Sequence, residues 1–121
     1  MYSIYLIRSE TEHILQWKIG ITENKPQRLI ELYAANPNIV GFEDTFEIRD
    51  RDIAYKVEAL LKSQLKQHFI GGEWLLGKAL DKKKFIDMCI KAEKSIQVWK
   101  EIQTELELTR KLDKLYKNKK Q

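Results

Sequence analysis

Four side chains in the first half of the chain could act together on a charged substrate: Tyr5, Lys18, Arg28 and Glu58. A phenol can accept a proton when a nearby cation stabilises the phenolate. A guanidinium presents a planar set of donors to a phosphate, and a single carboxylate can hold a Mg²⁺ ion that keeps several of its waters. These groups suit chemistry on a phosphate if the fold brings them together. Taken singly, a sheet-packing role for Tyr5 and a solvent-facing position for Lys18 are the default interpretations.

Two predicted strands would place Tyr5 and Lys18 on one surface, together with Gly20. Residues 17–22 alternate between large apolar side chains and small or polar ones, so Lys18 and Gly20 share the face opposite the apolar groups. The missing side chain of Gly20 leaves room on that face for a ligand. Residues 2–8 alternate in the same way, and a hairpin turning near residues 11–12 would set Tyr5 opposite Lys18.

Arg28 is predicted to lie in the first turn of a helix. Asn24 suits the N-cap of that helix, which spans residues 25–35, and Gln27 stands at the capping-box position three residues later. Because the helix follows the strand closely, Arg28 is expected to hold its guanidinium near Gly20.

Glu58 is predicted to lie on a second helix. Asp50 or Asp52 can cap this helix, which runs to about residue 68. Glu58 stands at the edge of its apolar stripe, where a carboxylate must be paired, hydrogen-bonded or bound to a metal. An ion pair between Arg28 and Glu58 therefore remains open beside the metal site.

These elements predict an α/β fold, with a small, mainly antiparallel sheet of three strands flanked by helices. Residues 39–48 supply the third strand. We expect residues 1–77 to form the domain that carries the site and residues 78–121 to form a C-terminal helical extension.

The extension raises a packing problem. Residues 81–117 contain no proline or glycine, and one helix of that length would extend roughly 50 Å, farther than so small a domain can cover. We expect self-association through residues 96–116, most simply as a two-fold dimer. The alternative is a helical hairpin that bends near Thr104 or Thr109.

Composition limits the class of protein. The 121 residues suit one compact domain, and the formal charge of +4 is a modest lean toward an anionic partner. A single cysteine, Cys89, cannot form an internal disulfide, which favours a reducing compartment. No apolar run is long enough to span a bilayer, so we expect a soluble cytoplasmic protein that does not bind membranes.

Short motifs in this order resemble the GIY-YIG nuclease superfamily, in particular its phage and bacterial branch, over about residues 2–76. The residues that carry the resemblance are Ser3-Ile4-Tyr5, Lys18-Ile19-Gly20, Arg28, Glu58 and Gly72-Glu73-Trp74-Leu75. Two positions depart from the family pattern: Ser3 replaces a glycine, and Lys18 replaces the second tyrosine.

The resemblance implies a metal-dependent DNA endonuclease or nickase that uses Mg²⁺ or Mn²⁺. It implies catalytic roles for Tyr5, Lys18, Arg28 and Glu58, with Glu58 as the metal ligand and Gly20 and Glu73 as accessory residues. Because the second tyrosine is missing, the alternative is a nucleic-acid-binding module that has lost the chemistry. A third interpretation is a protein-interaction factor in which only the C-terminal helix matters.

Overall fold

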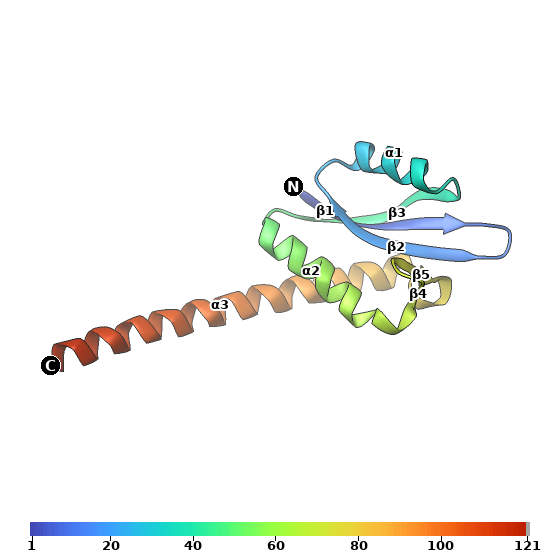
Figure 1. Cartoon of the computed structure of the whole chain (residues 1–121). Helices are drawn as coiled ribbons and strands as arrows, with labels where there is room; N and C mark the ends of the chain where they lie inside the picture. The colour runs from blue at the N-terminus through green and yellow to red at the C-terminus, as the bar shows by residue number, and fades with distance from the viewer. Residues whose placement is uncertain (121) are drawn as a thin grey trace.

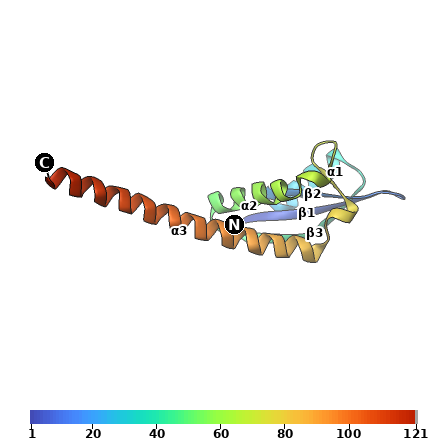
Figure 2. The same cartoon turned by 90° about the horizontal axis from the view of Figure 1, so that it is seen from below.

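The alternating residues near the N-terminus form two neighbouring interior strands of a sheet, β1 (Tyr2–Glu10) and β2 (Leu15–Thr22). β3 (Ile39–Ile48) pairs with the other edge of β1. The computed structural model describes residues 1–120, and its helices cover both faces of this sheet (Figures 1 and 2).

The sheet has five strands, in the order β3-β1-β2-β5-β4, and every strand pairing is antiparallel. The prediction of three strands was therefore wrong, because β4 (Phe69–Ile70) and β5 (Trp74–Leu76) extend the sheet beyond β2. Gly71 and Gly72 adopt positive φ angles of 54° and 110°, which favour glycine. They make the tight turn that lets these two short apolar runs pair.

The predicted register of the hairpin was also wrong, by two residues. Tyr5 pairs with Gly20, and Lys18 pairs with Ile7. The turn is closed by the Thr11 N–H, which donates to the Ile14 carbonyl at 2.9 Å, so its centre lies one residue later than predicted. A slip of two residues keeps every side chain on its expected face, so Tyr5, Lys18 and Gly20 still share one side of the sheet.

Each face of the sheet packs against different helices. α1 (Lys25–Ala35) covers one face, and α2 (Arg51–Gln64) covers the other together with the first half of α3 (Lys82–Lys120) (Figure 1). The α2 side holds the larger core, which joins Ile4, Leu6 and Ile19 of the sheet to residues of both helices. The α1 side holds a smaller core of Tyr5, Ile7, Leu32 and Ile39.

Short turns of 3₁₀ helix complete the chain. α2 ends at Gln64, earlier than predicted, and a 3₁₀ turn over Lys66–His68 leads into β4. A second turn over Gly77–Ala79 connects β5 to α3. There the indole Nε1 of Trp17 donates to the Gly77 carbonyl at 3.1 Å, which fixes the connection to β2.

α3 is one continuous helix of 39 residues, about 58 Å long. The predicted alternative of a hairpin was wrong, because the helix passes through Thr104 and Thr109 without a break. Both hydroxyls donate to carbonyls four residues earlier, at 3.0 and 2.9 Å, a local bond that α3 accommodates without ending. None of the helices within residues 1–120 combines the length and the apolar character needed to cross a bilayer.

Candidate phosphate-binding site

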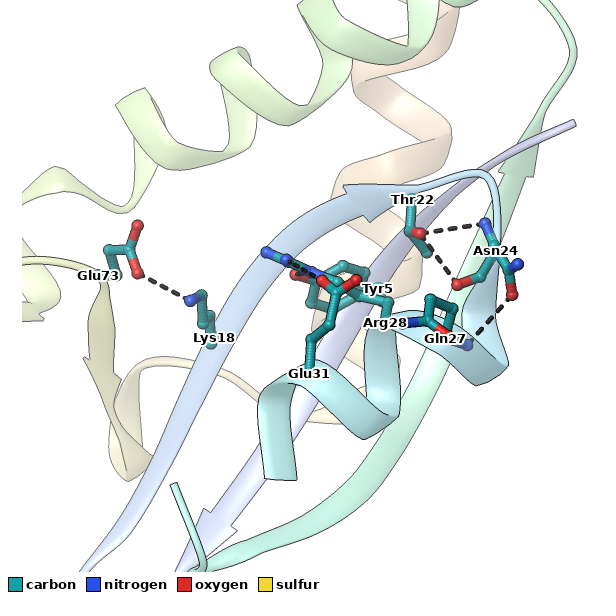
Figure 3. A network of polar contacts seen from close by, with 8 residues as sticks. All are labelled: Tyr5, Lys18, Thr22, Asn24, Gln27, Arg28, Glu31 and Glu73. Atoms are coloured by element: carbon teal, nitrogen blue, oxygen red, sulfur yellow. Dashed lines mark hydrogen bonds and ion pairs between the residues drawn. The ribbon is translucent and has the colours of Figure 1, made fainter. Parts of the chain in front are cut away.

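Arg28 and Tyr5 meet on the face of the sheet that α1 covers. The guanidinium Nε of Arg28 donates to the phenol oxygen of Tyr5 at 3.0 Å (Figure 3). This hydrogen bond is the main reason that the pKa of Arg28 is raised above its ordinary value, so the group is a permanent cation. One edge of the guanidinium is thereby fixed by β1.

Gly20 makes this arrangement possible. It lies beside Tyr5 on the neighbouring strand, and a Cβ atom at Gly20 would overlap the hydroxyl and ring of Tyr5. The expectation that Gly20 leaves room for a ligand was therefore wrong, because the tyrosine ring fills that room. Tyr5 is completely buried and packs edge-on against Phe42, with ring centroids 5.4 Å apart.

The start of α1 fixes the position of the Arg28 backbone. As predicted, the side chain of Asn24 accepts a hydrogen bond from the Gln27 N–H, at 3.1 Å. The second capping bond comes from an unexpected residue: the Asn24 N–H donates to the Thr22 hydroxyl at 3.1 Å. Both ends of the turn between β2 and α1 are thus held by side chains (Figure 3).

The outer edge of Arg28 reaches solvent. Its side chain is 36% exposed, and Nη1 lies 3.1 Å from a carboxylate oxygen of Glu31, one turn along α1. Arg28 and Glu31 line a pocket of about 390 Å³ beside the β2–α1 turn, together with residues 21–24 and Gln27. An anion can reach the guanidinium from this pocket if the exposed Glu31 side chain moves.

Lys18 forms a second charged pair on the same sheet face. Its Nζ lies 2.7 Å from a carboxylate oxygen of Glu73, in the turn between β4 and β5 (Figure 3). The Lys18 side chain is only 15% exposed and the Glu73 side chain is 69% exposed. The hydrogen bond from Lys18 holds the pKa of Glu73 below its ordinary value, so this pair is formed at neutral pH. The structure therefore pairs Lys18 with Glu73 and not with Tyr5.

Glu58 lies near the same group of charges, because its partner Lys62 helps Lys18 and Arg28 to lower the pKa of Glu73. It lies on α2, the helix that covers the other face of the sheet, and its carboxylate is 3.8 Å from the Nζ of Lys62. Within residues 1–120, no hydrogen bond or ion pair joins Glu58 to Tyr5, Lys18 or Arg28. The predicted alternative of an Arg28–Glu58 ion pair was wrong, because each residue pairs along its own helix.

A family model supplies independent information about the whole unit. The model of the T5orf172 domain matches residues 2–94, which include all five strands, α1, α2 and the buried start of α3. The chain belongs to the T5orf172 domain family. No curated protein and no solved structure matches the chain significantly.

This match corrects the assignment made from short motifs. T5orf172 is a different family from GIY-YIG, so the GIY-YIG assignment was wrong. Each motif had only three or four residues, and such residues also suit ordinary strands and turns. The T5orf172 domain is itself associated with nuclease-like and DNA-binding function, which agrees with the coarser expectation of a DNA partner.

Besides Thr22, sequence reasoning missed the roles of Glu31 and Ser3. Glu31 could have been found as the partner of Arg28, because residues three apart on a helix are neighbours. Ser3 was treated only as a departure from a motif. Its hydroxyl donates to Glu47 at 2.7 Å, and Glu47 also accepts a hydrogen bond from Lys25 at 3.0 Å, so Ser3 helps to tie β1 to β3 and α1.

Proposed function

We propose that this T5orf172 domain binds DNA and hydrolyses its phosphodiester bonds, as an endonuclease or nickase. One observation carries the proposal: Arg28 is held by the buried Tyr5 on one edge, and its other edge faces a pocket in which its partner is the exposed Glu31. A fixed, partly exposed guanidinium is well suited to hold a phosphate, because little side-chain freedom is lost on binding.

The residues on this face take separate roles in the proposal. Arg28 binds the scissile phosphate, and Tyr5 acts as a positioning residue that orients it. We assign this role to Tyr5 instead of the proton-acceptor role expected from the sequence, because the phenol is completely buried. Lys18 binds a neighbouring phosphate once the exposed Glu73 turns away.

A divalent ion fits the chain only in a limited way. The described residues contain no group of three or more histidine, cysteine, aspartate or glutamate side chains that could hold a metal ion. Mg²⁺ is often held by one or two carboxylates together with substrate phosphates and waters, so Glu58 would suit an ion that it shares with DNA. Such an ion, Mg²⁺ or Mn²⁺, would neutralise phosphate charge and activate water.

Cleavage of supercoiled plasmid tests the catalytic part of the proposal. We expect nicking by the wild-type chain in Mg²⁺ or Mn²⁺, loss of nicking in EDTA, and a reduction of at least 100-fold in Glu58→Gln. Glu12→Gln is the matched control, since it removes the same charge from an exposed loop. Absence of nicking with every divalent ion, or full activity in Glu58→Gln, would refute the proposed site.

The second candidate is a DNA-binding module without catalysis. The burial of Tyr5 and the pairing of Glu58 with Lys62 favour it. In that case binding is mainly electrostatic, weakens steeply with salt, and is the same in Glu58→Gln as in the wild type. The two candidates share the phosphate contact at Arg28 and differ in whether strands are cut.

We further propose that residues 1–77 carry the site and that the part of α3 beyond the domain core forms an extension whose segment 96–116 pairs two copies. Exposed apolar side chains on that segment support the pairing.

The proposed location is intracellular. Burial raises the pKa of the free Cys89 thiol to about 12, which makes it an unreactive core group and no disulfide partner.

A further inference from the structure

The side of α3 that packs on the domain does not remain apolar. Phe85, Cys89, Ala92 and Ile96 are buried against the sheet and α2. Eighteen residues make five turns of an α-helix, so the positions on the same side of the extension lie eighteen residues later. These positions are Gln103, Glu107, Arg110 and Lys114. The extension is therefore not built to continue the packing of its own domain.

Another side of the extension is apolar instead. Ile102 and Leu106 each stand one residue before a member of the polar line, which is roughly 100° around the helix. On this side Trp99, Ile102 and Leu106 are 52%, 49% and 45% exposed, whereas Leu112, which is 59% exposed, lies about 120° around the helix from Leu106. This side, which we call the outer face (residues 98–112), begins beside the body of the domain. There Val98, Trp99 and Ile102 form an exposed apolar patch on α3, beside Lys91, Lys94 and Ser95 of the same helix.

Charge along the extension is divided into two blocks. Residues 101–107 hold three glutamates and no basic residue. Residues 110–119 hold one aspartate and five basic residues: Arg110, Lys111, Lys114, Lys117 and Lys119. Two parallel helices would set acid against acid and base against base, whereas two antiparallel helices set each acidic block against a basic block.

We propose that two copies of the chain pair through the outer face with their α3 helices antiparallel, crossing near residues 107–110. This inference rests on the proposed pairing and adds its direction. About ten residues of helix separate the crossing from each body, so the two domains lie at opposite ends of the pair, roughly 30 Å apart. The two phosphate sites are then related by a two-fold axis through the crossing.

Spin labels at two positions test the pairing and its direction separately. A label at Thr109→Cys lies near the crossing, so any pairing of these segments gives a short distance, below about 20 Å. A label at Asn118→Cys gives roughly 30 Å in an antiparallel pair and about 10–15 Å in a parallel one. Cys89 is completely buried, and the wild-type chain serves as the labelling control.

Each result supports or overturns one step. A short distance at position 109 with a long distance at position 118 supports the antiparallel pair. A short distance at both positions overturns the direction and leaves the pairing intact. A chain that sediments as a monomer, with no distance at either position, overturns both, and the DNA site is tested separately by plasmid cleavage.

A charge variant gives a second test that does not depend on labels. Glu101→Lys combined with Glu105→Lys replaces the complementary contacts of an antiparallel pair with repulsion. We expect at least tenfold weaker dimerisation at low salt. Unchanged dimerisation would overturn the charge argument for the direction.

Discussion

At the scale of single residues, the site depends on a packing relation between two neighbouring strands. Tyr5 occupies the space above Gly20, and from there its hydroxyl accepts the hydrogen bond that orients Arg28. A larger side chain at position 20, or a different one at position 5, would change the position of Arg28. Tyr5, Gly20 and Arg28 should therefore behave as one unit. Lys18, on the same face, is held separately by Glu73.

Gly20→Ala should destabilise the fold, because the added methyl group overlaps the tyrosine ring. Overpacking of this kind costs about 1–3 kcal/mol, which urea denaturation can measure. Tyr5→Leu removes the ring that the methyl group overlaps. Gly20→Ala should therefore cost less stability in the Tyr5→Leu background than in the wild type. Strict additivity of the two changes would show that the overlap does not control this site.

Glu73→Gln should strengthen DNA binding. The substitution releases Lys18 from its ion pair, and a phosphate can then use the freed ammonium group. We expect the affinity for DNA to rise several-fold. We also expect the slope of log affinity against log salt concentration to steepen by about one, which corresponds to one more released counterion. Fluorescence anisotropy of a labelled duplex measures both, with Glu12→Gln as the control of equal charge change. Equal gains in the two variants would show a general effect of net charge and no role for the Lys18 pair.

At the scale of elements, the turn from β2 into α1 sets where Arg28 stands. Its caps could be predicted in part, because Asn24 and Gln27 follow a common pattern at helix starts. The contribution of Thr22 could not, because it depends on how the strand ends.

Asn24→Ala should weaken this turn. Loss of an N-cap costs about 1 kcal/mol of stability, and the Thr22 bond to the backbone remains. The shift in the urea midpoint gives the cost, while Asn38→Ala is a control at an exposed asparagine between α1 and β3. We also expect weaker DNA binding than in Asn38→Ala, since Arg28 loses part of its support. A midpoint equal to that of the control would contradict the cap's importance.

The sequence contained enough information to predict α1, β3 and the faces of β1 and β2, because each depends on local periodicity. The added strands β4 and β5 could not be predicted in the same way. Each has only two or three residues, and they pair because Gly71 and Gly72 turn the chain sharply. The hairpin register also escaped prediction, because it depends on the closing bond of the turn, Thr11 to Ile14.

The candidate site was predictable only in outline. Lys18, Gly20 and Tyr5 could be assigned to one face, since a strand alternates whatever its register. Their contacts could not be assigned, because the pairing of Lys18 with Glu73 joins residues 55 positions apart. Glu58 remains a predicted metal ligand, and its only ion pair within residues 1–120 is with Lys62.

At the scale of the whole molecule, α3 extends well beyond a small α/β body (Figures 1 and 2). Its first half completes the core of the T5orf172 domain, and its second half carries an exposed apolar face with divided charge. An antiparallel pair would present two phosphate sites to one DNA molecule. Binding to a long duplex would then exceed the affinity of one site, because the second contact is intramolecular.

The central claim is that Arg28 contacts a DNA phosphate, and one comparison tests it most directly. Arg28→Ala and Arg49→Ala each remove one positive charge, but Arg49 is exposed and lies outside the site. We predict that Arg28→Ala weakens binding to a short duplex at least tenfold. It should also reduce the slope of log affinity against log salt concentration by about one. Arg49→Ala should change the affinity less than threefold. Equal effects of the two substitutions on affinity and on salt dependence would contradict the account.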